Sequence, residues 1–550
     1  MPRARRRLLL ASAVAVGLAA SSIAWTSATA APGTASASQP QHNFIVVLRD
    51  QHTNLAISKG MRSARVQATQ RDQAPLLASA SKMGARNVRG FSLVNGFAAS
   101  MTAAQVNSIA ANPQVAAVLP DRPISRPSIA TTTPAVGAAT AATDTSTICP
   151  SDPTKPLLEP EALQTTHTAF QNTSTPQAQN IVDGSGVKVA WIADGIDIDN
   201  PDFIRADGSH VFVDYQDFSG DGLAAPTLGG EAFGDASSIA AQGLHAYDLA
   251  NFVVPQQQLP TGCTITVRGV APGASLVGLK VFGAAPTAPT SRFIEAIDYA
   301  VNVDQVDVLN ESFGANPFPD FSLDPVSLAD DAAVAAGVTV VSGTGDAGTA
   351  GTFQSPATDP NVISVAGTTN LRLYQQTGFE GANFDNGTWA NDNIASLSGG
   401  GTSQAARVPD LAAPGDSGWA LCTPDLDQYA ECADFKGAPS PIEDFGGTSQ
   451  SSPLVSGAAA LVIEAYENTH HGVRPSPALV KQFLTSTATD LGAPAYEQGA
   501  GELNSLAAVQ AARSWRDGNG KPASVANAII AGPTQLTGIG NGGSTATESL

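Results

Sequence analysis

The sequence has few cysteines and few charged residues, and beyond its first residues it has no long hydrophobic run. Four cysteines among 550 residues are too few for a disulfide-rich scaffold, although they allow two bridges. Charged residues make up 14% of the chain and hydrophobic residues 43%, which excludes a wholly disordered protein. Because single cores rarely exceed ~250–300 residues, we expect more than one folding unit.

Basic residues are scarce and unevenly placed. The chain carries 48 acidic and 28 basic side chains, a net charge of −20, which argues against nucleic acid or an anionic membrane as a partner. Up to Ser128 there are 14 basic and 3 acidic side chains, a charge of +11. The remaining residues carry 14 basic and 45 acidic groups, a charge of −31. A basic front piece is therefore joined to an acidic body.

The first residues have the pattern of an export signal. Four arginines precede an apolar run over residues 8–20, and Ala28-Thr29-Ala30 offers a cleavage site. The run is shorter than the ~20 residues that span a bilayer, which favours a cleaved signal peptide over residues 1–30; an uncleaved anchor is the alternative. We expect a secreted, extracellular monomer without membrane attachment once the signal is removed.

The oxidising exterior permits disulfides. Cys422 and Cys432 are close enough in sequence to close a small loop, which would leave Cys149 and Cys263 as a long-range pair. Four cysteines allow three connectivities, and the spacing alone leaves them open.

Hydrophobic patterning divides the rest of the chain. Residues 43–128 predict strand-helix-strand-strand-helix-strand, a small α+β ferredoxin-like unit, and residues 129–156 predict a linker. Over residues 157–511 apolar strands alternate with helices, which indicates an α/β domain with a mostly parallel sheet covered on both faces. The strands are predicted at 187–192, 211–213, 275–281, 306–309, 338–341 and 362–365, and the helices at 237–252, 292–303, 328–336 and 454–467. No domain is assigned to residues 512–550.

A serine lies in a small-residue loop ahead of an apolar helix. Gly446-Gly-Thr-Ser-Gln-Ser-Ser-Pro453 places Ser449 where a helix N-terminus and exposed backbone N–H groups can stabilise an oxyanion. This loop resembles the nucleophile motif of the subtilase clan of serine peptidases. Residues 187–203, 269–275 and 496–504 resemble further segments of that family. The resemblance implies a subtilisin-like fold, polypeptide substrates, and an inhibitory propeptide formed by the front unit. It also assigns substrate binding to the strand that carries Ser312, Phe313 and Gly314.

Two positions depart from the subtilase pattern. The family's catalytic Asp aligns with Ala193, and Asp194 follows one residue later, where it is either catalytic or a turn residue. The family's helix begins with the histidine base, and the best counterpart of that segment is Gln242-Gly-Leu-His245. Glutamine cannot act as a base, so no Asp-His-Ser triad can be written.

A related family, the sedolisins, suggests another set of residues. Sedolisins pair Glu and Asp four residues apart on a helix and place an Asp where subtilases have the oxyanion Asn. Glu231, Asp235 and Asp346 match that pattern, because two carboxyls one helical turn apart can share a proton. The alternative is that Glu231 and Asp235 only stabilise a helix N-terminus.

These observations predict a secreted serine endopeptidase made as a proenzyme. Ser449 would be the nucleophile, and Glu231 with Asp235, Asp194 and Asp346 would complete the site. No cofactor or metal is predicted, and no motif indicates a structural calcium ion. The rival hypothesis is a subtilase-like binding protein that has lost its base. An α/β-hydrolase esterase is excluded because the sequence contains no Gly-x-Ser-x-Gly elbow.

Overall fold

The computed structural model describes residues 40–126, 148–254, 259–315, 323–377, 391–403 and 406–515, and the backbone of two short strands, β19 (Ser524–Val525) and β20 (Ala528–Ile529). From Gln41 onward the chain forms one compact unit. The predicted signal peptide, most of the predicted linker and most of residues 512–550 lie outside the described residues. None of the described helices is long and apolar enough to cross a membrane.

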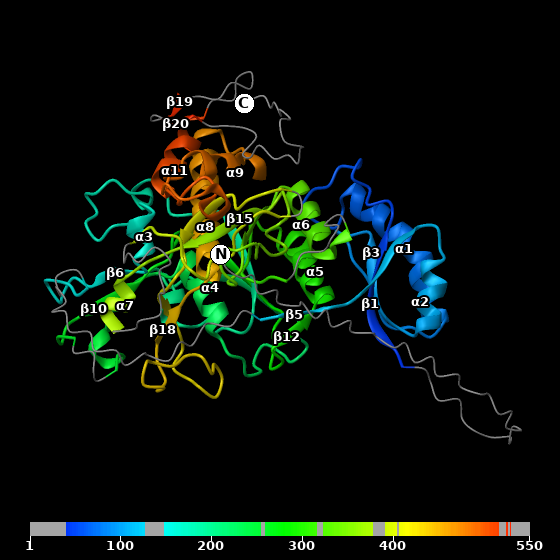
Figure 1. Ribbon diagram of the computed structural model, residues 1–550, viewed down its shortest axis with the longest axis horizontal. Coiled ribbons are helices and arrows are strands. Elements are labelled where there is room, and N and C mark those ends of the chain that lie inside the picture. Colours follow the sequence, from blue (N-terminus) through cyan, green and yellow to red (C-terminus); the bar gives the residue numbers. More distant parts are fainter. Residues whose placement is uncertain are drawn as a thin grey trace, which may run out of the picture. The chain divides into compact units, whose positions relative to one another are not determined.

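The front unit is a four-stranded antiparallel sheet with two helices, and the predicted order of its elements is confirmed (Figure 1). The strands lie in the order β2-β3-β1-β4. Thr102 caps the second helix by accepting a hydrogen bond from the N–H of Gln105, whose side chain returns one to the Thr102 N–H, a capping box. The elements are β1 (His42–Leu48), α1 (Ala64–Lys82), β2 (Arg86–Gly90), β3 (Gly96–Met101), α2 (Ala103–Ala110) and β4 (Val115–Pro120).

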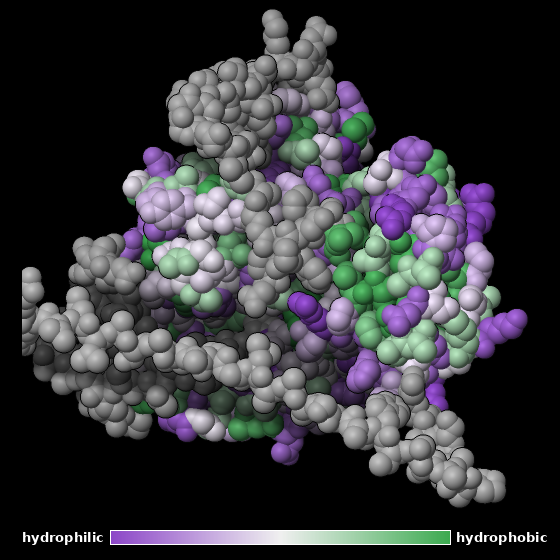
Figure 2. Space-filling view, turned by 45° about the vertical axis from the view of Figure 1, so that its right-hand side comes forward, coloured by the Kyte–Doolittle hydropathy of each residue, from purple (hydrophilic) through white to green (hydrophobic). Residues whose placement is uncertain are grey.

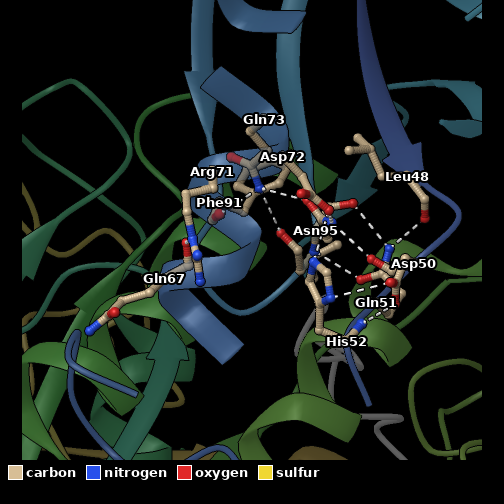
Figure 3. Close-up of polar contacts among 11 residues, drawn as sticks. Leu48, Asp50, Gln51, His52, Gln67, Arg71, Asp72, Gln73, Phe91 and Asn95 are labelled. Carbon is tan, nitrogen blue, oxygen red and sulfur yellow. Dashed lines mark hydrogen bonds and ion pairs between the residues drawn. The ribbon is translucent and has the colours of Figure 1, made fainter. Parts of the chain in front are cut away.

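A polar network fixes the loops at one end of this sheet (Figure 3). The buried Asn95 amide donates to the Asp50 carbonyl oxygen at 2.8 Å and to Asp72 Oδ2 at 3.2 Å. His52 Nε2 lies 2.8 Å from the same Asp72 oxygen, and Gln51 Nε2 donates to the Asn95 carbonyl oxygen. The turn before β3 is therefore held by side chains from three separate segments.

The second part of the chain is built on seven parallel strands, which confirms the predicted α/β class. The order is β16-β15-β14-β13-β7-β11-β8. The edge strand β16 was not predicted from the sequence. The strands are β7 (Lys188–Ala193), β8 (Phe212–Asp217), β11 (Ser275–Lys280), β13 (Val308–Glu311), β14 (Thr339–Gly343), β15 (Ile363–Thr368) and β16 (Leu411–Pro414).

Helices cover both faces of this sheet, as predicted (Figure 1). Alternate residues of β7 enter different cores: Val189 and Trp191 pack with α4, α8, α9 and α11, whereas Ala190 and Ile192 pack with α5 and α6. The helices are α4 (Gly230–Ala240), α5 (Thr290–Tyr299) with its π-helical continuation η4 (Ala300–Asp304), α6 (Pro325–Ala335), α8 (Thr448–Thr469), α9 (Pro477–Ser486) and α11 (Ser505–Ser514).

The predicted helix over residues 237–252 is wrong. Helix α4 begins earlier, at Gly230, and ends at Ala240. Every residue of α4 is buried, so the segment lacks the polar face that periodicity relies on. The chain then continues through Gly243, whose φ of +67° lies in the left-handed region, to the short strand β9 (Tyr247–Asp248) and the 3₁₀ turn η3 (Leu249–Asn251).

Two disulfides join loop segments, and their pairing is the one expected from sequence proximity. Cys149 bonds to Cys263 and Cys422 bonds to Cys432. The remaining short elements are β5 (Pro123–Ser125), β6 (Leu157–Glu159), α3 (Ala162–Thr165), η1 (Ala178–Asn180), η2 (Pro201–Phe203), β10 (Thr264–Val267), β12 (Thr287–Pro289), α7 (Arg372–Thr377), β17 (Gly418–Leu421), β18 (Ile442–Phe445) and α10 (Ala495–Gln498).

The front unit and the α/β domain share a core. Ile45, Val47 and Phe91 of the front unit belong to the same buried cluster as α5 and α6. The face seen in Figure 2 carries hydrophilic and hydrophobic residues interspersed. The end of the front unit continues as β5, which pairs antiparallel with β12 of the α/β domain. This pairing places the end of the front unit near Ser449.

Candidate active site

Ser449 lies in the first turn of α8 and is 6% exposed. Its hydroxyl donates to the Ser312 carbonyl oxygen at 3.4 Å. The helix begins at Thr448, before the predicted start, and includes Pro453. Because Pro453 has no N–H, it cannot bond to the Ser449 carbonyl oxygen four residues earlier, which instead lies 3.2 Å from the Ser312 hydroxyl oxygen. The carbonyl group left without its helical partner thus contacts Ser312, the residue that follows β13.

Glu231 and Asp235 lie one turn apart on α4, and both are buried. The Ser312 hydroxyl donates to Asp235 Oδ1 at 2.6 Å. Burial, and then the neighbouring Asp235 carboxyl, raise the pKa of Glu231 well above its ordinary value, while the nearby Ser449 hydroxyl lowers it. Burial likewise raises the pKa of Asp235. Neither Glu231 oxygen has a hydrogen-bond partner among the described residues, so this carboxyl is free to bond to Ser449.

Gly234 allows α4 to pack at this position. A Cβ atom built on it would lie 2.3 Å from the Phe445 ring, closer than side chains tolerate. The glycine that interrupts the Glu231–Asp235 turn in the sequence therefore lets the helix approach β18.

Asp194 directly follows β7 and lies against the N-terminal end of α4. Its two carboxylate oxygens accept hydrogen bonds from the N–H groups of Gly229, at 2.7 Å, and Ala232, at 3.1 Å. Burial raises its pKa, and the bond from Gly229 partly offsets this. Both oxygens thus face the first turn of α4, where a carboxylate stabilises the helix that carries Glu231.

Asp346 lies beside the loop that precedes Ser449. Its Oδ1 accepts hydrogen bonds from the Thr448 N–H at 2.7 Å and the Thr448 hydroxyl at 3.0 Å. Burial raises the pKa of Asp346, although both bonds lower it. Gly447, with a φ of +82°, gives the carboxyl room, since a Cβ there would lie 2.6 Å from Asp346 Oδ2. Asp346 therefore contacts Gly447 and Thr448, the two residues that precede Ser449.

A pocket opens beside Ser449. Ser312, Phe313 and Gly314, the three residues assigned to substrate binding, line it together with the end of the front unit. The full lining is Ser125, Arg126, Ser312, Phe313, Gly314, Gly343, Asp346, Gln354, Thr448 and Ser449. Ser125 and Arg126, at the end of the front unit, thus line the same pocket as the predicted nucleophile.

The structure corrects the position given to Gln242. Gln242 follows the end of α4 instead of beginning a helix, and its amide donates to the Ala240 and Pro272 carbonyl oxygens. His245 Nδ1 lies 3.0 Å from Asp202 Oδ1, and the imidazole is 52% exposed. It is Glu231 that lies at the start of α4.

Asn310 and Ser452 complete the polar network and were not predicted. The Asn310 amide donates to Ser312 Oγ at 2.9 Å, and the Ser452 hydroxyl lies 3.1 Å from the same atom. Asn310 lies on β13 and Ser312 directly follows its end, and the spacing of two residues along an extended chain is a signal that the sequence could have supplied. Ser452 lies one helical turn after Ser449.

One group of potential metal ligands occurs among the described residues, formed by Cys422, Cys432 and Glu443. Its two sulfur atoms are bonded to each other, so they do not hold an ion. We assign no metal or cofactor to any residue.

Comparison with known proteins shows the family of this chain. Residues 184–501 match the model of the subtilase family, and residues 43–126 match that of the peptidase inhibitor I9. Subtilisin E of Bacillus subtilis (strain 168) is 30% identical over 334 residues, 60% of this chain and 66% of the relative. Subtilisin of Bacillus pumilus is 29% identical over 60% of this chain and 92% of the relative. The membrane-bound transcription factor site-1 protease of Rattus norvegicus is 32% identical over 45% of this chain, and the match spans only 20% of that relative. With a subtilase model covering more than half of its residues, and an I9 domain before it, the chain belongs to the subtilase family.

Proposed function

We propose that this chain is a secreted serine endopeptidase, made as a proenzyme, that uses a carboxyl base in place of histidine. The observation that carries the proposal is the position of Glu231, which lies beside the Ser449 hydroxyl with no hydrogen-bond partner of its own among the described residues. Secretion is proposed from the signal pattern at the N-terminus and from the name of one curated match, the minor extracellular protease Vpr of Bacillus subtilis.

In the proposed reaction Ser449 Oγ attacks the carbonyl carbon of the scissile peptide bond, and Glu231 accepts the hydroxyl proton. Asp235, fixed by Ser312, shares the proton of Glu231 and stabilises the pair. Asp346, whose pKa is raised by burial, donates a hydrogen bond to the oxyanion when it is protonated. Glu231 then gives its proton to the leaving amine, and water hydrolyses the acyl-enzyme by the same steps. Asp194 positions Glu231 through the first turn of α4.

A mechanism of this kind favours acidic conditions. Because Glu231 and Asp235 both have raised pKa values, they retain a shared proton at higher pH than isolated carboxyls would. Asp346 must also keep its proton to donate. We therefore expect a bell-shaped dependence of activity on pH, with its maximum on the acidic side of neutrality.

The proenzyme part of the proposal is supported by the path of the front unit. Arg126 donates its N–H to the Pro286 carbonyl oxygen, and Ser125 and Arg126 line the pocket beside Ser449. A segment bound in this way would block polypeptide substrates until it is removed. The front unit is then both the first substrate and the inhibitor.

Expression of the full chain with four variants tests the proposal. Loss of the front unit, followed by mass spectrometry, reports self-processing, and labelling with a fluorophosphonate reports reactive Ser449. We expect Ser449→Ala and Glu231→Gln to remain unprocessed. We expect His245→Ala and Gln242→Ala to mature normally, because neither side chain reaches the site. Processing by Glu231→Gln would exclude the carboxyl base, and a wild-type chain that neither processes nor labels would favour the rival binding protein.

A further inference from the structure

Gln354 forms one wall of the pocket beside Ser449. Its side chain touches two glycines at once: a Cβ built on Gly314 would lie 2.1 Å from its Cδ, and one built on Gly345 would lie 2.5 Å from the same atom. The carboxamide therefore lies between the strand assigned to substrate binding and the loop that leads to Asp346.

The backbone holds Gln354 firmly in that place. Its N–H donates to the Thr344 carbonyl oxygen at 3.2 Å. The next residue, Ser355, exchanges two hydrogen bonds with Ala315, at 2.9 and 3.0 Å. The residue is thus anchored on both sides of the pocket, to the chain before Gly345 and to the chain after Gly314. These backbone bonds fix the point from which the Gln354 side chain enters the pocket wall.

The chemistry of the wall is neutral and polar. A carboxamide offers two donors and one acceptor, and at this position it carries no charge. Among the described residues that line the pocket from the α/β domain, Asp346 is the only carboxyl, and one of its oxygens is already occupied by Thr448. The pocket therefore offers a lysine or arginine no carboxyl other than Asp346, which the proposed mechanism uses for the oxyanion, and an apolar side chain would leave the carboxamide unpaired.

We propose that Gln354 determines the specificity of this pocket. The preferred substrates carry a glutamine, or a protonated glutamate, at the residue whose carbonyl Ser449 attacks. Either side chain ends in a neutral group that both donates and accepts, and it can pair with the Gln354 carboxamide. This inference rests on the proposed function, since it names the substrate class of the same site.

Four internally quenched peptides that differ only at that residue test the inference on the processed wild-type enzyme. The residue is Gln, Glu, Leu or Lys. We expect kcat/KM to be roughly tenfold higher for Gln than for Leu, because Leu strands a polar group. The Glu peptide should match Gln at pH 4 and fall behind it by pH 7, as its carboxyl, with an ordinary pKa of ~4.3, ionises.

The variant Gln354→Met keeps the length of the side chain and removes its hydrogen bonds. We expect it to reverse the order, with Leu cleaved better than Gln, whereas the matched control Gln482→Met on α9 should leave the order unchanged. Gln354→Glu is a second variant, and it should gain activity on the Lys peptide at pH 7. Fluorophosphonate labelling confirms that each variant is folded.

The outcomes separate this inference from the proposed function. An active wild-type enzyme that cleaves Leu as well as Gln, or a Gln354→Met variant with an unchanged order, would overturn the inference alone. A wild-type enzyme that cleaves none of the four peptides and does not process itself would overturn the proposed function as well.

Discussion

The Ser312 hydroxyl donates a hydrogen bond to Asp235 Oδ1 at 2.6 Å, and its oxygen also lies 3.2 Å from the Ser449 carbonyl oxygen. One side chain thus joins the acidic helix α4 to the helix of the predicted nucleophile. The sequence resemblance assigns Ser312 to substrate binding through its backbone, and the structure adds this second contact through its side chain.

Removing the Ser312 hydroxyl tests its contribution to catalysis. The bond from Ser312 lowers the pKa of Asp235, so its loss raises that pKa further. We expect Ser312→Ala to lower kcat roughly tenfold, the cost of one hydrogen bond to a charged group, and to move the acidic limb of the pH profile to higher pH. Peptide hydrolysis between pH 3 and 8 measures both effects.

Ser342→Ala is the matched control for that variant. Ser342 is a buried serine on the neighbouring strand β14, and its hydroxyl has no hydrogen-bond partner among the described residues. Its loss should leave the pH profile in place. If both variants behave alike, the effect of Ser312 is one of packing.

A second pair of buried carboxyls predicts how stability depends on pH. Glu311 on β13 and Asp330 on α6 are both fully buried, and none of their four oxygens has a hydrogen-bond partner among the described residues. Burial raises the pKa of Glu311 to about 8, and burial together with Glu311 raises that of Asp330 well above its ordinary value.

A carboxyl whose pKa is raised by folding stabilises the fold most below its unfolded pKa of ~4.3 and loses that contribution as pH rises through its folded pKa. We therefore expect the Ser449→Ala proenzyme to lose stability between pH 5 and pH 8.5 in urea unfolding. Glu311→Gln stays neutral and should reduce that loss by roughly 1–3 kcal/mol. The exposed Asp427→Asn should not. Equal unfolding midpoints at both pH values in the parent chain would contradict this prediction.

Opposite charges join the front unit to the α/β domain, and salt should weaken that contact. Lys59 pairs with the buried Asp307 and Arg89 pairs with Glu295. The Asp298 carboxylate accepts hydrogen bonds from the N–H groups of Ser92 and Leu93. We expect the inhibition constant of the released front unit to rise as NaCl is raised from 0.05 to 1 M, because salt screens exposed pairs.

Variants at two arginines distinguish the effect of one specific ion pair on inhibition from the effect of net charge. Arg89→Ala removes the pair with Glu295, whereas Arg71→Ala removes the same charge from α1, where Arg71 bonds to its own helix at Gln67 (Figure 3). We expect Arg89→Ala to weaken inhibition roughly fivefold at low salt, and Arg71→Ala to weaken it less. Equal effects would mean that only net charge matters.

Gly234 should tolerate no side chain. Alanine normally stabilises a helix by ~1 kcal/mol relative to glycine, but a Cβ here would lie 2.3 Å from the Phe445 ring. We expect Gly234→Ala to destabilise the protein by about 1–3 kcal/mol and to slow self-processing, because α4 carries Glu231 and Asp235 away from Ser449. Adding Phe445→Leu should recover part of both losses in thermal unfolding and processing assays.

Local patterns in the sequence predicted much of this protein. Apolar runs located six of the seven central strands, because a buried parallel strand is a short and uninterrupted run of apolar residues. The loop around Ser449 was identified because glycines, serines and a proline are required at a tight helix entry. Helix α4 was misplaced because all its residues are buried, and Gln242 therefore follows a helix instead of beginning one.

By itself, the sequence determined the fold class, the order of the front unit, and the loop of Ser449, since each depends on residues close together in the chain. Only the tertiary structure decided which groups surround Ser449. Glu231 lies beside it, with Asp235 one turn further on, because Gly234 lets α4 pack on Phe445. Ser312, 137 positions before Ser449 in the chain, contacts both Asp235 and Ser449. Such contacts are set by the packing of helices on a sheet, which no local pattern records.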